Sequence, residues 1–469
     1  MAVTIAQAPL YNTLPIGQQV IFAISEDTIV ATKFKVKFVA EVYVSDSGIT
    51  YAASELIGTF KTTPNNKGVG IFDLRPVLET FVKPDNEGST FGNGSRYKQS
   101  YSIPVAQAVR HPLHLIDKYA MSENSIKYFA IKFQVEYAES ATDSVLAPSN
   151  TTNTSQYLMF NGVLQYDDVL TLTSGNYGYN LDSFYLDDVN AKFLTNAPTN
   201  QYARLTDYGT LPFLNFLPAG SVDKITSIHL EYYNSAGVNI GSENPLQNWN
   251  NGGSEGPGDW SQKRIMYFGA FPGNLRNWST IFQALVTADT ISYYTVQAFS
   301  TVGASSELYT INIICPNERG YEGIRLTWLN QWGVWDYYTF NKKSVRSIST
   351  NRTSYTQLGG TWNESTFKVS GYKGGKKNFR VNSSEKIKLN TDFVTEAEGV
   401  WFEELINSTE VYIVNSFDDT PDTATITNKY IEPVVLTTSS YVKKTIANNK
   451  LMQYSIEIEK SKMQRTQSV

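Results

Sequence analysis

Hydrophobic and polar residues alternate with a period of two along much of this chain. In residues 33–44 the apolar side chains of one face are Phe34, Val36, Phe38, Ala40, Val42 and Val44. Residues 129–137 repeat the pattern with Phe129, Ile131, Phe133, Val135 and Tyr137. Such alternation predicts β-strands with one buried face. Similar segments occur at 227–233, 292–298, 308–314, 411–414 and 452–458, between turn sequences such as 64–68 and 234–237.

Two segments have a helical pattern instead. Residues 73–82 carry a proline where a first helical turn tolerates it, and their shared apolar face holds Leu74, Val77, Leu78 and Phe81. Residues 395–407 carry an apolar stripe of Val400, Trp401, Phe402 and Leu405, with acidic residues in the first turn. The sequence therefore predicts a mainly β fold of several antiparallel β-sandwich domains with a few short helices.

The length of 469 residues suggests about three domains. A Ser/Thr/Asn/Ala-rich run and a Pro-Asn-Glu-Arg-Gly sequence place the boundaries near residues 145 and 318. We expect an N-terminal β-sandwich (1–145), a central β domain with a long Gly-rich loop at 248–259 (146–317), and a C-terminal β domain with one helix and an extended C-terminal arm (318–469). The basic segment 441–469 suits either an arm on an acidic neighbour or nucleic acid, or a solvated strand with a frayed end.

Composition narrows the possible chemistry. One cysteine and three histidines exclude a cysteine zinc cluster and disfavour a His-based centre, and the net charge of −5 gives no signal for nucleic-acid binding. The N-terminus lacks a secretory signal pattern, and no apolar stretch is long enough for a membrane span. Aromatic residues make up 13% of the chain, which favours a packed structural or binding protein. We expect no cofactor and no catalytic residue.

Several short motifs have weak chemical interpretations. His111 and His114 lack a third metal ligand, and the acidic pairs at 167–168, 187–188 and 418–419 lack the spacing of a calcium loop. The segment 373–377, Lys-Gly-Gly-Lys-Lys, lacks P-loop spacing, so we interpret it as a hairpin turn with solvated lysines. Cys315 ends an apolar run and is interpreted as a small core residue, and His229 lies in a strand pattern and is interpreted as a packed or surface strand residue.

The densest aromatic segment is residues 325–340. Asn330-Gln-Trp-Gly333 predicts a tight turn in which Gly333 adopts a positive φ, between two strands. Its aromatic residues either pack across the strands in a core, which we favour, or stack on sugar rings. The candidate structural or interface residues of the chain are Trp328, Trp332, Gly333, Trp335, Asp336, Trp249, Trp260 and Trp401.

Six segments together resemble one protein group. They are the pattern of Arg325, Asn330, Gly333, Asp336 and Phe340, the segments 57–61 and 64–74, the segment 392–412, and the tail segments 440–445 and 451–458. In this order they are similar to virion structural proteins of tailed phages that infect Bacteroidetes, of the crAss-like podophage type. Residues 146–316 carry little of the resemblance.

The resemblance implies a non-enzymatic tail, neck or ring protein, made in the host cytoplasm and located in the virion. Copies are expected to form a cyclic oligomer around the tail axis and to dock other tail, neck or portal proteins, with no membrane span and no direct nucleic-acid contact. Residues 248–259 and both termini are the expected contact sites. The alternative is a receptor- or glycan-binding tail fibre or adaptor, with exposed Trp249, Trp260 and Trp278 in a groove. A polysaccharide hydrolase needs a carboxylate pair that the sequence does not nominate.

Overall fold

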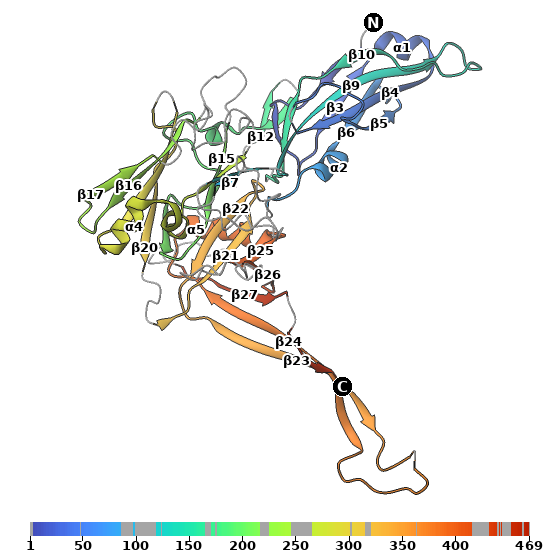
Figure 1. The fold of residues 1–469 in the computed structure, drawn as a ribbon. Coiled ribbons are helices and arrows are strands. Elements are labelled where there is room, and N and C mark those ends of the chain that lie inside the picture. The colour runs from blue at the N-terminus through green and yellow to red at the C-terminus, as the bar shows by residue number, and fades with distance from the viewer. Residues whose placement is uncertain are drawn as a thin grey trace. The chain divides into compact units, whose positions relative to one another are not determined.

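A computed structural model gives the fold of the chain (Figure 1). The residues that it describes are 3–46, 48–85, 97–98, 119–122, 124–164, 170–173, 176–215, 225–244, 265–300, 303–314, 320–362, 364–414, 431–438, 440, 442, 452–461 and 464–468. The fold is mainly β, with antiparallel sheets and short helices, which confirms the predicted fold class. Contacts divide the chain into two compact units. Unit 1 holds the described residues up to Ile314 together with Leu329–Asp336, and unit 2 holds the other described residues.

Unit 1 begins with a β-sandwich. One sheet has the order β1 (Thr4–Gln7), β3 (Ile21–Ser25), β6 (Val69–Asp73). The other has the order β2 (Thr13–Pro15), β11 (Tyr157–Phe160), β9 (Ile126–Ala138), β4 (Phe34–Ser45), β5 (Leu56–Thr62), with β10 (Ser149–Asn153) on β9. The sheets share one core, in which the Phe133 ring lies 5.7 Å from that of Phe22 and 5.8 Å from that of Phe72.

The predicted alternation of β4 holds over most of the strand. Phe38, Ala40 and Val42 are buried in the shared core, as expected. Phe34 was expected on the same face, but this prediction is wrong, because its side chain is 48% exposed. Lys35 has a φ of 51° and the pairing with β9 shifts between Phe34 and Lys37, which interrupts the period-two pattern.

Short helices accompany these sheets. They are α1 (Asp27–Thr32) and α2 (Arg75–Leu78), with α2 continued by a 3₁₀ turn at Glu79–Phe81. Helix α2 lies where the sequence predicts a helix over 73–82. It begins later than predicted because β6 extends to Asp73. Leu74 and Leu78 are buried, in agreement with the predicted apolar face.

The other described residues of unit 1 form three further sheets. Their orders are β14 (Asn200–Arg204), β20 (Tyr309–Ile314), β19 (Tyr293–Phe299), β16 (Ser227–Tyr233), β17 (Asn239–Glu243); β15 (Thr210–Leu214), β18 (Ile265–Gly269), β8 (Tyr119–Met121), β7 (Tyr97–Lys98); and β12 (Leu170–Thr173), β13 (Asn176–Tyr179). The helical segments are a 3₁₀ turn at Asp182–Phe184, α3 (Pro272–Trp278) and α4 (Thr280–Thr287). Phe193 links the first two sheets, because its ring lies 5.9 Å from Phe213 of β15 and 5.0 Å from Tyr309 of β20.

The described residues of unit 2 form one sheet and one helix. The sheet order is β22 (Trp335–Phe340), β21 (Ile324–Leu329), β25 (Val411–Val414), β26 (Ile431–Leu436), β27 (Ser455–Lys460), β24 (Gly375–Asn390), β23 (Val345–Gln357), with β28 (Gln464–Ser468) on β24. The helix α5 (Glu396–Asn407) begins at the N-cap Thr395, whose side chain forms a capping box with Glu398. This confirms the predicted helix over 395–407.

The buried face of α5 is aromatic. Trp401 and Phe402 pack against Trp328 of β21, with ring centroids 5.0 Å and 6.4 Å away. Val400 was expected in the same stripe, but it is 53% exposed, because the buried side of the helix is formed by Gly399, Trp401, Phe402 and Leu405.

The basic C-terminal segment contributes a central strand rather than only an end. β27 pairs with β24 on one side and with β26 on the other, and its Ile456 and Ile458 are buried. The two interpretations of the segment, as a contact arm or a frayed end, stay predictions for the residues outside the described part.

In unit 1, β10 and β11 follow the predicted boundary near residue 145 and pair with β9. The three-domain division stays a prediction.

Candidate functional site

The most exposed element of unit 2 is a long β-hairpin, here called the hairpin arm and defined as residues 345–390. Its strands β23 and β24 pair from Val345 opposite Lys388 to Gln357 opposite Gly375, with one register shift between Thr353 and Ser354. In Figure 1 they run beyond the neighbouring strands of their sheet as a two-stranded ribbon. Residues 358–374 connect them and are here called the tip loop. Isolated two-stranded ribbons are marginally stable in water, so an ordered one of this length needs additional contacts.

The base of the hairpin arm is anchored in its own unit. The Arg346 guanidinium donates to Glu385 on the opposite strand at 2.9 Å and to Glu322 at 2.8 Å. This hydrogen bond from Arg346 is the main reason that the pKa of Glu385 lies below its ordinary value. Ile387 and Leu389 of β24 are fully buried, and β28 pairs with β24 at Arg380 and at Asn382 and Ser383. Residues 348–380, beyond the ion pairs of Arg346 and Lys386, are here called the outer hairpin arm. Among the described residues, a third strand pairs with this part only at Arg380.

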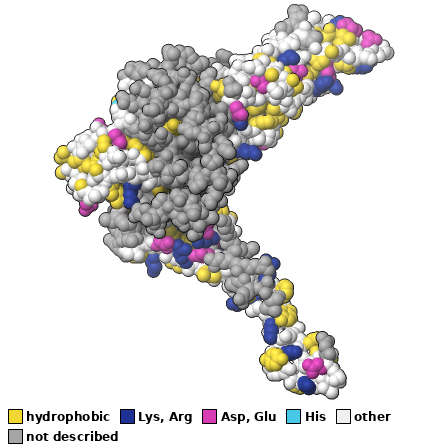
Figure 2. Space-filling view, viewed as in Figure 1, with side chains coloured by type: hydrophobic (Ala, Val, Ile, Leu, Met, Phe, Trp, Pro, Cys, Tyr) yellow, Lys and Arg dark blue, Asp and Glu magenta, His cyan; other side chains and the backbone are white. Residues whose placement is uncertain are grey.

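Large apolar side chains are exposed along the outer hairpin arm. They are Ile348, Leu358, Trp362, Phe367, Val369, Tyr372 and Phe379, each more than half exposed. The extremes are Val369 at 87% and Tyr372 at 78%. Scattered exposed apolar residues are normal, but a group of this size on one projecting element is typical of an interaction surface. Figure 2 shows apolar and basic side chains next to one another on this element.

Hydrogen bonds give the tip loop a defined shape. The Thr361 hydroxyl donates to the Thr366 carbonyl at 3.0 Å and accepts from the Lys368 amide at 2.8 Å. The Trp362 indole donates to the Gly359 carbonyl at 2.7 Å, and its ring meets the Phe367 ring edge-on at 5.5 Å. The aromatic side chains are therefore held in place before any partner binds.

Glycines allow the turn at each end of the tip loop. Gly360 has a φ of 72°, and a Cβ there would lie 2.4 Å from the Phe367 ring. Gly374 and Gly375 have φ values of 92° and 79°, a region that side chains disfavour. The hairpin turn predicted at 373–377 is wrong in its position, because β24 begins at Gly375 and the turn lies at 370–373, where the Lys373 amide donates to the Ser370 carbonyl at 3.0 Å. Lys376 and Lys377 are exposed, as expected, whereas Lys373 is half-buried.

The hairpin arm is strongly basic. It contains nine Lys or Arg residues and two Glu residues, a formal charge of +7, whereas the whole chain carries −5. At its base, Arg346 and Lys386 form ion pairs within unit 2. Further out, none of the ion pairs among the described residues involves Arg352, Lys373, Lys376, Lys377 or Arg380. The outer arm therefore presents uncompensated positive charge beside apolar groups.

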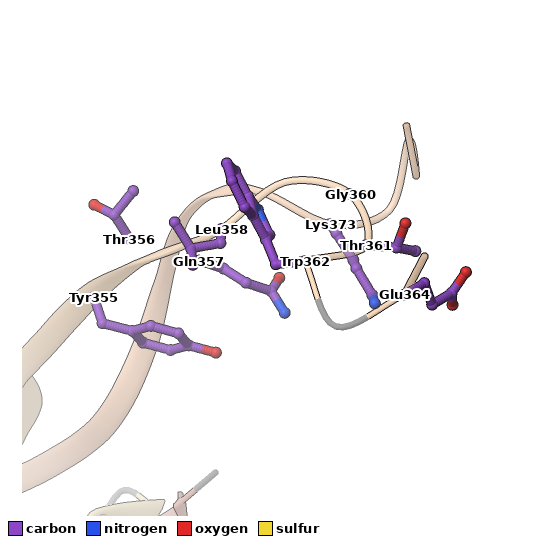
Figure 3. A pocket seen from close by; sticks show the side chains of 9 residues that line it. All are labelled: Tyr355, Thr356, Gln357, Leu358, Gly360, Thr361, Trp362, Glu364 and Lys373. Carbon is purple, nitrogen blue, oxygen red and sulfur yellow. The ribbon is translucent and has the colours of Figure 1, made fainter. Parts of the chain in front are cut away.

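An open hollow of about 420 Å³ lies at the outer end of the hairpin arm. Tyr355 and Gln357 of β23 line it together with Trp362, Glu364 and Lys373 of the tip loop (Figure 3). Lys373 also lies over the Tyr372 ring, with its Nζ 5.9 Å from the centroid. The hollow offers an aromatic wall, a carboxylate and an ammonium group, which suits binding of a polar group rather than a reaction at a buried centre.

The turn predicted at residues 330–333 lies within unit 1. The Asn330 amide donates to the Val334 carbonyl at 2.8 Å, and the Gly333 amide donates to the Asn330 carbonyl at 3.0 Å. Gly333 has a φ of 71°, which confirms the predicted positive φ. Its Cα faces the Asn161 backbone so closely that a Cβ would lie 1.6 Å from the Asn161 oxygen.

The tryptophans around this turn are buried. Trp328, Trp332, Trp335 and Trp401 are each at most 3% exposed, and so is Asp336. Within unit 1, the Trp332 ring lies 4.0 Å from that of Phe184 and the Trp335 indole donates to the Asp85 carbonyl at 2.7 Å. Asp336 accepts from the Thr195 hydroxyl at 2.6 Å. These side chains are thus placed for packing inside the chain, and their surface is not offered to a partner.

Other predicted residues lie outside the described part of the chain. These are Trp249, Trp260, the loop 248–259, His111, His114 and Cys315. Trp278 is described and half-buried, with its ring edge-on to Phe268. His229 is packed, as expected: its ring stacks on Phe299 at 3.7 Å, and burial lowers its pKa. In the described part of the chain, no group of three or more His, Cys, Asp or Glu is arranged to hold a metal ion.

Sequence reasoning missed the hairpin arm as a unit. The sequence pattern places a turn at 373–377, next to the turn observed at 370–373, and assigns no role to residues 345–372. The available signal was a Ser/Thr-rich segment at 345–357 in which neither alternating face is apolar, unlike the strands of the sandwiches. Such a strand has no core to face, which indicates a projecting ribbon.

Two further observations concern the whole chain. No helix in the described part is long and apolar enough to cross a membrane. Comparison of the sequence with protein-family models finds no match, and comparison with curated proteins finds none either.

Proposed function

We propose that this protein is a non-enzymatic structural component of a phage virion, in the tail or neck. Copies assemble as a ring around the tail axis and dock other tail, neck or portal proteins. The observation that carries the proposal is the hairpin arm, an ordered element with large apolar side chains exposed at its end. Exposed apolar surface of this kind on a projecting element is best explained by a partner that covers it.

The sequence resemblance supports the same proposal from different residues. Its motifs fall on packing elements: the pattern at 325–340 includes the turn at Gly333, and the segment 392–412 includes α5. Such residues determine a fold rather than a reaction, which is consistent with a structural role. The resemblance supplies the virion location, with synthesis in the host cytoplasm, and the tail or neck assignment.

A projecting arm also suits assembly into a ring. An arm that binds a different surface on the next copy makes a heterologous contact, and such contacts close into a ring when the rotation per copy allows it. Aromatic and arginine side chains are favoured at the centre of interfaces, and the outer hairpin arm offers both.

The experiment is mass photometry and negative-stain electron microscopy of the purified full chain over a range of concentrations. Discrete oligomers with rotational symmetry are the expected result. A chain that stays monomeric at every concentration would contradict assembly from copies alone. Electron cryomicroscopy of particles that contain the protein is expected to place its copies around the tail axis.

A second candidate function is recognition of a host glycan. The specific observation in its favour is the hollow at the tip loop, where Tyr355 and Trp362 supply aromatic surface and Glu364 and Lys373 supply polar groups. Aromatic rings beside hydrogen-bonding groups suit a sugar ring. A glycan array with the wild-type chain and the Trp362→Ala variant tests this function. Binding of a defined glycan that the variant loses would favour a fibre or adaptor over a ring component.

A further inference from the structure

We infer that the outer hairpin arm binds a second copy of this chain, on the acidic surface outside that copy's own arm. The inference rests on the proposed function as an assembling protein and adds the element and the partner. Three properties of the arm support it: its charge, the kind of apolar groups it exposes, and the order of its tip loop.

The opposite charges of the hairpin arm and of the rest of the chain favour a second copy as the partner. The hairpin arm carries +7 and the whole chain −5, so the remaining residues carry −12. The outer basic residues, Arg352, Lys376, Lys377 and Arg380, are exposed and in no ion pair among the described residues. Every copy therefore presents a positive element and a negative body, and opposite potentials of this kind orient two molecules as they meet.

The exposed apolar groups favour a protein partner over a nucleic acid. Leu358 and Val369 are aliphatic and 67% and 87% exposed, so they gain by burial against apolar protein surface but offer no ring for stacking on a base. Glu364 of the tip loop lies 3.7 Å from the Lys368 ammonium, so this pair adds little net charge to the tip. A protein surface that is acidic and partly apolar accommodates both the aliphatic side chains and the basic ones.

The order of the tip loop lowers the entropy lost on binding. Trp362 and Phe367 are fixed by the indole hydrogen bond to Gly359, by their mutual contact and by Gly360 beneath the Phe367 ring. Groups that already hold their bound arrangement bind more tightly, because less rotational freedom is lost. Tyr372 and Val369 project from this ordered loop and are the groups we expect to be buried by the partner copy.

The test compares assembly of the wild-type chain with variants that keep the tip loop intact. Val369→Ser with Tyr372→Ser removes two highly exposed apolar groups, and Val238→Ser, at a 57% exposed position in unit 1, is the matched control. We expect the dissociation constant between copies to rise about tenfold or more for the double variant and to change less than about twofold for the control. Circular dichroism and the thermal midpoint check that each variant is folded.

A second pair of variants tests the charge. Lys376→Glu with Lys377→Glu reverses two exposed arm charges, and Lys67→Glu reverses one exposed charge in a turn of unit 1. The arm variant is expected to weaken assembly, and the wild-type assembly is expected to weaken as salt rises from about 0.05 to 0.5 M. The Lys67 variant is expected to assemble as the wild type does.

Cross-linking identifies the partner directly. A carbodiimide that joins lysine to carboxylate is applied to an equal mixture of ¹⁵N-labelled and unlabelled chains. Mixed-isotope peptides that join Lys376 or Lys377 to Asp or Glu outside residues 345–390 support the inference. Cross-links confined to one isotope would overturn it, because the arm would then contact its own chain.

The failures of the two proposals are distinguishable. A wild-type chain that stays monomeric contradicts both self-assembly and the inference. A wild-type chain that assembles equally well after the arm substitutions overturns the inference and leaves the proposed function standing. Binding of single- or double-stranded DNA that depends on Lys376 and Lys377, with assembly unaffected, would also overturn it.

Discussion

Gly333 gives a severe test of the fold, because two separate effects forbid any side chain there. Its φ of 71° is left-handed, where a residue with a Cβ costs about 1–2 kcal/mol. In addition, an ideal Cβ would lie 1.6 Å from the Asn161 oxygen and 2.4 Å from the Asn161 carbonyl carbon. Both atoms belong to the backbone, so no side-chain rotation relieves the overlap.

The expected loss in the free energy of unfolding follows from the hydrogen bonds that Gly333→Ala would strain. To make room in Gly333→Ala, the turn has to separate from residues 161–163, which strains the hydrogen bond from the Val163 amide to the Gln331 carbonyl, now 2.8 Å. It also strains the hydrogen bond of 3.0 Å from the Asn330 side-chain amide to the Leu194 carbonyl. At about 1 kcal/mol for each lost bond plus the backbone cost, we expect a loss of about 3–4 kcal/mol in the free energy of unfolding.

The matched control is Gly237→Ala. Gly237 lies in unit 1 with a φ of 74°, and its nearest neighbour is the Tyr293 hydroxyl, 3.7 Å from an ideal Cβ. This substitution incurs the backbone cost alone, about 1–2 kcal/mol. Guanidinium denaturation followed by tryptophan fluorescence measures both variants, and Trp332 and Trp335 adjoin the turn. Equal destabilisation by the two substitutions would refute the close approach to Asn161.

Three further predictions concern packing, capping and pH. Phe133→Ala removes a ring that packs between the two sheets, and it is expected to lower the free energy of unfolding, measured by urea denaturation, by about 3–5 kcal/mol. Phe34→Ala, at a position 48% exposed, is expected to lower it much less. Similar losses for the two variants would contradict the shared core. Thr395→Ala removes the N-cap of α5 and is expected to cost about 1 kcal/mol, measured by the thermal midpoint. The pKa of Glu385 is lowered from 4.5 chiefly by its hydrogen bond from Arg346, so its contribution to stability is present above pH 4.5 and is lost as pH falls through the folded-state pKa. Acid unfolding of the Arg346→Met variant is therefore expected to depend less steeply on pH below 4.5, and an unchanged slope would contradict this assignment.

The structure also changes how the C-terminal segment is to be tested. Truncation after residue 441 is expected from sequence to weaken assembly by removing an arm. In the structure, the same truncation would remove β27, a strand that lies between β24 and β26 and whose Ile456 and Ile458 are buried. The truncated chain is therefore expected to lose the sheet of unit 2, so substitutions on the hairpin arm are the better test of assembly.

Local patterns in the sequence predict an element correctly where local interactions decide its structure. The alternation at 129–137 and the pattern at 395–407 predict β9 and α5, since a buried face repeats every two residues in a strand and every three or four in a helix. The turn at Gly333 is predicted correctly because a positive φ strongly favours glycine, whereas the turn expected at 373–377 lies at 370–373. Phe34 and Val400 were misplaced, because a register shift in one case and the direction of packing in the other depend on neighbouring elements.

By itself, the sequence determined a mainly β chain with aromatic packing, because composition and periodicity act residue by residue. Only the tertiary structure decided which aromatic residues are covered and which are exposed. Trp328, Trp332, Trp335 and Trp401 are buried by partners distant in sequence, whereas Trp362 and Tyr372 project from the hairpin arm. The physical reason is that the burial of a side chain depends on the elements that pack against it, and a side chain's own hydrophobicity does not specify them.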